Sequence, residues 1–168
     1  MTSALDQRRV KRAPPTRGRL LRVAVGECHQ RSFTVTRERC ISNLVEDLPS
    51  IMGTYALVEW MEIAAALCIG DFLDQDQLSV AESIDIQHFK AVGEGAQVHV
   101  DAVVRQVLGS RVWFDIRAHV DDIKVGECIH VRAVVPRRLL ERVVERVAAG
   151  AMAASRLPPN SLADRPPD

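Results

Sequence analysis

Residues 53–70 read GTYALVEWMEIAAALCIG, and this stretch decides the fold. Its apolar side chains recur at the three-and-four spacing of a helix face and continue around the other faces, which indicates a helix that is buried on every side. Gly70 marks its end. The two carboxylates in the stretch are Glu59 and Glu62. A carboxylate on a buried helix must either reach solvent at the edge of the buried region or be held by a partner in a site that is partly shielded from water.

Four segments after this helix alternate apolar and polar residues, which is the period of a β-strand. Turn-like sequences at 93–95, 109–110 and 121–122 separate them, and another short strand pattern at 32–36 precedes the helix. We expect the four later strands to be joined as consecutive antiparallel hairpins. Their predicted apolar faces are Val80, Ile84, Ile86 and His88; Ala96, Val98, Val100, Ala102 and Val104; Val112, Phe114, Ile116, Ala118 and Val120; and Ile129, Val131, Ala133 and Val135.

An antiparallel sheet that buries one face needs a cover, and the helix over 53–70 is the segment apolar enough to supply it. The sequence therefore predicts an α+β fold, with the antiparallel sheet wrapped around one long buried helix. One helix packed on one sheet leaves apolar surface uncovered. A second copy of the chain would bury this surface, so we expect a homodimer or a higher homo-oligomer. An extra C-terminal amphipathic helix, starting at Pro136, is expected to pack on its own sheet or along the dimer.

Composition divides the chain of 168 residues into four parts. Residues 1–30 are a basic arm and residues 156–168 a proline-containing tail, and both are expected to be disordered. Residues 31–135 form the globular domain and residues 136–155 the second helix. No segment approaches the roughly 18 apolar residues needed to span a bilayer, so we expect a cytoplasmic protein with no membrane partner.

Charge and cysteine usage exclude several classes of ligand. The four cysteines lie far apart with no CxxC pair, so we expect reduced thiols, no metal site and no cofactor. Nine acidic residues and no Lys or Arg fall between Arg39 and Lys90, while basic residues gather in the N-terminal arm. The arm has no aromatic residues interleaved with its basic residues, and it contains no recognisable nucleic-acid-binding motif. A nucleic-acid partner is therefore not expected.

Four side chains are candidates for a reactive site. Thr54 begins the helix, Glu62 lies on it, His88 is on the apolar phase of the next strand, and Arg132 is on the last strand. Together they would supply a hydroxyl, a base and an anion-binding group. Taken singly, Thr54 is equally well explained as an N-cap, His88 as a satisfied core residue and Arg132 as a surface cation.

These residues resemble the fluoroacetyl-CoA thioesterase-like branch of the hotdog-fold thioesterases. The resemblance covers about residues 33–135 and rests on T-x-x-L-V-x-x-M-E from Thr54 to Glu62, on His88, and on GECIHVRAVV over 126–135. It implies a hotdog fold and hydrolysis of the thioester of a small acyl-CoA. It also implies that Thr54, Glu62 and His88 are catalytic and that Arg132 contacts the substrate.

Two positions depart from the family pattern. Ala81 stands where the family has a glycine that approaches the thioester; its amide can still donate to the substrate, but its methyl group narrows the approach. The segment before Thr54 is aliphatic where the fluoroacetyl-selective member has aromatic gating residues, so fluoroacetyl selectivity is not expected. Its apolar side chains are Val45, Leu48, Ile51 and Met52. The positive charge needed at the CoA end would come from Lys90, Arg132, Arg137 and Arg138, of which Arg137 and Arg138 could meet phosphate.

Two other functions fit the same fold. One is a non-catalytic acyl-CoA-sensing module whose basic arm contacts DNA, and the other is a hotdog enoyl-CoA hydratase, in which we would expect an aspartate and histidine pair instead of Thr54 and Glu62.

The spacing of the helix residues constrains the thioesterase hypothesis. Thr54 and Glu62 are eight residues apart, which is about 12 Å along a helix. Either two subunits share a site, or the segment before the helix folds back. Burial would disfavour the ionised form of Glu62, and a nearby His88 would counter this so that the pair shares a proton.

Overall fold

The computed structural model describes residues 22–155, with the side chains described as far as residue 150. The predicted tail and most of the predicted arm lie outside these residues. The elements, in order, are β1 (Cys28–Thr34), two 3-10 turns (Arg37–Arg39 and Ile41–Asn43), α1 (Thr54–Gly70), β2 (Gln77–His88), β3 (Gln97–Leu108), β4 (Arg111–Val120), β5 (Ile123–Pro136) and α2 (Arg137–Ser155). No described helix is long and apolar enough to cross a membrane.

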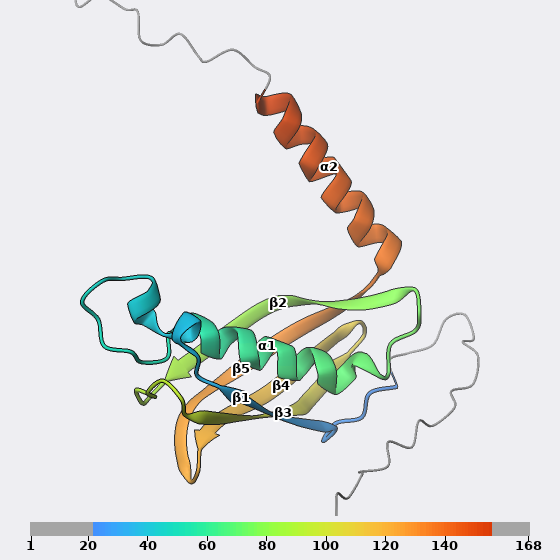
Figure 1. The fold of residues 1–168 in the computed structure, drawn as a ribbon. Helices are drawn as coiled ribbons and strands as arrows, with labels where there is room; N and C mark the ends of the chain where they lie inside the picture. The colour runs from blue at the N-terminus through green and yellow to red at the C-terminus, as the bar shows by residue number, and fades with distance from the viewer. Residues whose placement is uncertain (1–21, 156–168) are drawn as a thin grey trace, which may run out of the picture.

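The strands form one antiparallel sheet in the order β1-β3-β4-β5-β2, with α1 lying across one face (Figure 1). The β3–β4 and β4–β5 hairpins agree with the sequence prediction. The prediction of a β2–β3 hairpin is wrong, because β2 pairs with β5 and β3 pairs with β1. α1 runs along this face with Thr54, its first residue, beside His88 at the end of β2, and with Cys68 near the carbonyl oxygens of Glu27, just before β1, and of Ala102 on β3. The first strand also begins at Cys28, earlier than the predicted start.

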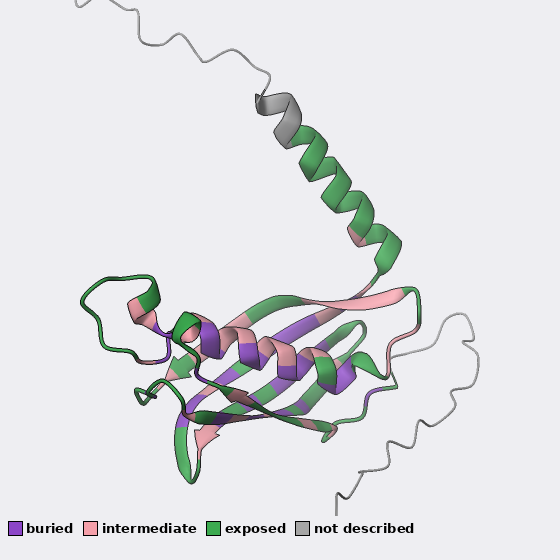
Figure 2. Cartoon of the chain, in the orientation of Figure 1, coloured by how far each residue is buried: buried purple, intermediate pink, exposed green. Residues whose placement is uncertain are grey.

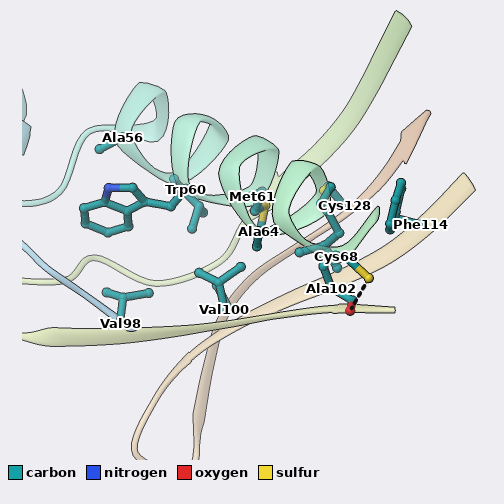
Figure 3. Close-up of a cluster of buried hydrophobic side chains, with 14 of the residues drawn as sticks. Ala56, Trp60, Met61, Ala64, Cys68, Val98, Val100, Ala102, Phe114 and Cys128 are labelled. Atoms are coloured by element: carbon teal, nitrogen blue, oxygen red, sulfur yellow. Dashed lines mark hydrogen bonds between the residues drawn. The ribbon is translucent and has the colours of Figure 1, made fainter. Parts of the chain in front are cut away.

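The core lies between α1 and the strands β3 and β4. Figure 3 shows side chains of α1 lying above Val98, Val100 and Ala102 of β3, with Cys68 reaching the Ala102 carbonyl at one end. The buried α1 residues are Ala56, Leu57, Trp60, Met61, Ala64, Ala65, Cys68 and Ile69. Fully burying a large apolar side chain contributes about 1.5–3 kcal/mol, so this layer supplies much of the driving force for folding. The apolar faces predicted for these two strands are confirmed at their centres, where residues alternate between buried and partly exposed.

The predicted apolar face of β5 is the wrong one. Residues 128, 130, 132 and 134 of this strand face α1, and Ile129 on the predicted face is 43% exposed. The inward positions include His130 and Arg132, whose polarity hid the alternation in the sequence. Burial on β5 therefore follows the pairing with β4 and not the apolar residue pattern.

A β-bulge interrupts β2. Ala81 pairs with Arg132 and Ser83 pairs with Val131, so Glu82 is an extra residue between them. The bulge changes which residues point inward: Ser79 and Ala81 before it, and Ile84, Ile86 and His88 after it, share the face of α1. The predicted face containing both Val80 and Ile84 is therefore wrong.

Gly126 of β5 is packed between Leu57 of α1 and the backbone of β2. A Cβ atom there would be 2.7 Å from Leu57 Cδ2 and 2.9 Å from the Gln87 carbonyl oxygen. We expect Gly126→Ala to lower the free energy of unfolding by about 1–3 kcal/mol, the usual cost of overpacking. Urea unfolding measures this.

The matched control is Gly70→Ala, whose Cβ would meet no atom within 4 Å. We expect this change to stabilise the protein by up to about 1 kcal/mol, because alanine lowers the conformational entropy of the unfolded chain. Equal effects of the two substitutions would contradict the close approach of α1 at Gly126.

α2 projects away from the sheet, and its described side chains are largely exposed (Figure 2). Val144 and Val147 of its apolar stripe are 59% and 67% exposed. The expectation that α2 packs on its own sheet is therefore wrong for the part of α2 whose side chains are described, because this part meets the sheet at the end of β5 and then leaves it. Packing along a dimer stays a prediction.

The four cysteines are free, and all but Cys28 are buried. Burial raises the pKa of Cys68 to about 11 and that of Cys128 to about 12, so both thiols stay protonated at neutral pH. Among the described residues no group of three His, Cys, Asp or Glu side chains is placed to hold a metal ion.

Candidate active site

Thr54 and His88 meet at the N-terminal end of α1. Thr54 is the first residue of the helix and His88 is the last residue of β2. Thr54 Oγ1 lies 3.0 Å from His88 Nδ1, a hydrogen bond whose direction depends on the tautomer of the ring. The N-cap position belongs to Gly53, so the interpretation of Thr54 as an N-cap is wrong. The hydroxyl group of Thr54 bonds to the imidazole instead of to a helix amide.

The other ring nitrogen of His88 is unused. Nε2 is buried, and no described residue of the chain gives it a hydrogen-bond partner. Buried polar atoms are nearly always satisfied, so an unsatisfied one needs an explanation. A substrate, a water molecule or a group of a second subunit would satisfy this nitrogen.

An open pocket of about 330 Å³ lies beside the pair. Its lining comes from the segment before α1 and from the segment that continues β2, which are joined by a hydrogen bond from the Met52 amide to the Val92 carbonyl oxygen. Most of the lining is apolar, and Lys90 adds one cation. The residues are Ile41, Ile51, Met52, Gly53, Thr54, His88, Phe89, Lys90 and Ala91. The space suits a small apolar group placed against Thr54 and His88.

The two carboxylates of α1 have different surroundings. Glu59 forms a two-bond ion pair with Arg39, with Nη2 of Arg39 lying 3.0 Å from Oε1. Glu62 is half-buried, and among the described residues its carboxylate receives no hydrogen bond and no ion pair. Glu59 therefore fastens the segment before α1 to the helix, while Glu62 remains available for chemistry.

Glu62 and His88 are not hydrogen-bonded to one another within the chain, since His88 Nδ1 bonds to Thr54 and Nε2 has no partner among the described residues. The expected sharing of a proton between this carboxylate and this ring is therefore not seen inside one subunit. Since Thr54 is a full eight residues before Glu62 on one continuous helix, the segment before α1 does not fold Thr54 back onto Glu62.

Arg132 is a buried residue and not a surface cation, with 7% of its surface exposed. Its Nε donates to Ser79 Oγ at 3.1 Å and its Nη2 to the Ser79 carbonyl oxygen at 3.0 Å. Nη1 reaches the Glu62 carbonyl oxygen at 3.5 Å. Burial lowers the pKa of Arg132, and the nearby Glu62 carboxylate raises it. Arg132 therefore links β2 to the turn of α1 that carries Glu62.

Ala81 pairs with Arg132 across β2 and β5 and is exposed on an edge strand. His130, which is fully buried beside Arg132, was not predicted as a site residue from the sequence. The available signal was its spacing of two residues from Arg132, which places both side chains on one face of a strand. The structure thus forms two groups of candidates, Thr54 with His88 and Glu62 with Arg132.

Comparisons with known proteins indicate the family of the chain. The sequence model of the family described as fluoroacetyl-CoA-specific thioesterase, FlK, matches residues 35–138. A fluoroacetyl-CoA thioesterase from Streptantibioticus cattleyicolor is 27% identical over 117 residues, which are 66% of this chain and 84% of the relative.

Solved structures extend the likeness to the whole domain. One of FlK has 25% identity and a TM-score of 0.70, covering 74% of this chain and 96% of FlK. A hot-dog-like protein from Thermanaerovibrio acidaminovorans has 27% identity and a TM-score of 0.68, covering 73% of this chain and 91% of its own. The chain therefore belongs to the family of fluoroacetyl-CoA-specific thioesterases and is a thioester hydrolase of the hotdog fold.

Proposed function

We propose that this thioesterase hydrolyses the thioester of a small acyl-CoA, with Thr54, His88 and Glu62 as catalytic residues. The observation that carries the proposal is the Thr54–His88 hydrogen bond at an apolar pocket, with the second ring nitrogen buried and unpartnered. A mutant of FlK has been solved in complex with fluoroacetate and CoA, which supports a CoA thioester as the substrate class. We also keep the prediction of a cytoplasmic location.

The proposed chemistry follows from these groups. A thioester has a good leaving group, so catalysis needs chiefly a base and donors for the developing oxyanion. Glu62, whose carboxylate has no hydrogen-bonded partner among the described residues, serves as the base for water or for the Thr54 hydroxyl. His88 orients Thr54 through Nδ1 and leaves Nε2 for the substrate or for the carboxylate. The backbone amide of Ala81 is the proposed donor to the thioester carbonyl.

We further propose a homodimer in which each site combines two subunits. β2 is an edge strand of the sheet, and residues 81–83 at its bulge are all exposed. A free strand edge is ready to pair with another strand. An antiparallel pairing of two copies of β2, with Ala81 of one opposite His88 of the other, would bring Glu62 of one subunit toward the Thr54–His88 pair of the other.

The acyl group is proposed to be short and aliphatic. The pocket wall before Thr54 contributes Ile41, Ile51 and Met52 and no aromatic side chain. Lys90 at the same pocket is the proposed contact for a CoA phosphate. The roles of Arg137 and Arg138 toward phosphate stay predictions.

The experiment that tests the function measures thiol release from a panel of short, branched and aromatic acyl-CoA thioesters, with fluoroacetyl-CoA included. We expect the short aliphatic thioesters to give the highest kcat/KM and fluoroacetyl-CoA to have no special advantage. Addition of water to crotonyl-CoA without thiol release would indicate a hydratase. Binding of acyl-CoA with neither reaction would indicate a sensing module.

Arg132→Ala is expected to raise KM more than it lowers kcat, because an arginine at this place holds a substrate group and does not move protons. The measurement is a steady-state comparison with wild type, after circular dichroism has shown that the variant is folded. An unchanged KM with a collapsed kcat would contradict the substrate-binding role of Arg132.

A further inference from the structure

His130 and Arg132 are the two buried polar residues in the described part of the chain. They lie side by side on the inward face of β5, beneath α1. Burying polar groups is unfavourable unless they are hydrogen-bonded. The neighbours of His130 and Arg132 on this face of β5 include Cys128 and Val134. The hydrogen-bond partners of His130 therefore indicate why a histidine occupies a buried position here.

The two partners of His130 fix its tautomer. Nδ1 lies 2.8 Å from the Ser83 carbonyl oxygen, which can only accept, so Nδ1 carries the proton. Nε2 lies 3.2 Å from Nη1 of Arg132, which can only donate, so Nε2 accepts. Only the neutral ring with its proton on Nδ1 makes both bonds. Burial also lowers the pKa of His130, in spite of the Ser83 carbonyl, which raises it.

The orientation of the ring is held on one more side. Phe114 of β4 stacks on it, with 6.3 Å between the ring centroids and 29° between the planes. Ser83, whose carbonyl oxygen accepts from Nδ1, follows Glu82 in the bulge of β2. Since bulges redirect side chains near functional sites, this bond joins the bulge to the position of the ring. His130 is therefore a fixed acceptor for Arg132.

Arg132 connects His130 to α1. Its Nη1 donates both to His130 Nε2 and to the carbonyl oxygen of Glu62, while Ser79 accepts from Nε and from Nη2. Without His130, Nη1 would keep only the longer of its two bonds, at 3.5 Å. The guanidinium group would then be fastened mainly at Ser79, on the far side from the ring.

We propose that His130 is a positioning residue of the thioesterase site, which acts by holding the guanidinium group of Arg132 against the turn of α1 that carries Glu62. The inference rests on the proposed roles of Arg132 and Glu62 in thioester hydrolysis. His130 itself touches neither substrate nor the reacting atoms; its effect passes through Arg132.

Two substitutions separate the two bonds of His130. Asparagine places its amide group near Nδ1 and can still donate to the Ser83 carbonyl oxygen, but it does not reach Arg132. Glutamine places its amide group near Nε2 and can accept from Nη1. We expect His130→Asn to raise KM by about tenfold or more, the scale of one lost hydrogen bond to a charged group, with a smaller change in kcat. We expect His130→Gln to stay within about twofold of wild type.

A double-mutant cycle tests whether His130 acts through Arg132. In an Arg132→Ala background, His130→Asn should change kcat/KM by no more than about twofold, because the group that it positions is already gone. A full additional tenfold loss in that background would overturn the proposal. So would the reverse ranking of the single variants, with asparagine active and glutamine impaired, because that would mean that only the Ser83 bond matters.

A spectroscopic measurement on the wild-type protein does not depend on how the variants fold. The long-range ¹H–¹⁵N spectrum at neutral pH is expected to show His130 as the neutral Nδ1–H tautomer. A charged ring or an Nε2–H tautomer would overturn the proposal. A wild-type protein that releases no thiol from any acyl-CoA would instead overturn the proposed function, so the two failures are distinguishable.

Discussion

Glu62→Gln and His88→Ala are each expected to lower kcat for thioester hydrolysis by at least about a hundredfold, the usual scale for losing a general base or its partner. Glu62→Gln keeps the size of the side chain and removes the basic carboxylate. His88→Ala removes the ring that bonds to Thr54 and that carries the buried, unpartnered Nε2. Single-turnover measurement of thiol release with saturating substrate isolates the chemical step.

Glu59→Gln is a matched control for the first variant. Glu59 lies three residues before Glu62 on the same helix, but it pairs with Arg39 and does not line the pocket. Because the pair is more than a third exposed, losing it is expected to cost little stability, and the rate should stay near wild type. Retention of most activity in folded Glu62→Gln or His88→Ala protein would remove that residue from the catalytic set.

A mixed dimer of a Thr54→Ala chain with a Glu62→Gln chain is expected to recover roughly half of the wild-type activity, although each parent homodimer is inactive. With sites shared between subunits, one of the two composite sites in the heterodimer has both Thr54 and Glu62 intact. Two affinity tags allow the heterodimer to be purified before thiol release is measured. No activity above that of the parents would mean that each site is built within one subunit.

The Thr54–His88 contact supplies a negative control for this experiment. These two side chains meet within one chain, so a Thr54→Ala chain mixed with a His88→Ala chain leaves a lesion in both composite sites. This second heterodimer should therefore stay inactive. Recovery of activity in both mixtures would point to residual activity of a parent, or to a site that takes Thr54 and His88 from different subunits, and not to the proposed site.

Sequence patterns correctly predicted the faces on which the buried residues are apolar. One face of α1 and the inward faces of β3 and β4 consist of apolar side chains, so helical spacing and strand alternation predicted their burial. The prediction that α1 is buried on every side is wrong within this chain, because its other face is only partly covered and Leu67 is 41% exposed. β5 was predicted on the wrong face because His130 and Arg132 occupy buried positions. Their burial depends on partners in β2 and α1, which are distant in the sequence.

The candidate site was predictable in composition but not in arrangement. The motif from Thr54 to Glu62 and the position of His88 identified the reactive residues through a family resemblance. No local pattern indicates that Thr54 bonds to a ring 34 residues away, or that β2 lies beside β5 instead of β3. Such pairings join segments that are distant in the sequence, so they are a property of the whole chain.

The extra residue in β2 has a consequence for how this site can be lost during evolution. Glu82 contributes no catalytic group, yet it sets the phase of the strand that ends at His88. Because strand side chains alternate between faces, deleting this one codon would turn either Ser79 and Ala81 or His88 to the opposite face while every catalytic residue is kept. A gene in this lineage can therefore retain the full motif and still encode an inactive protein, so the length of β2 must be compared along with its residues.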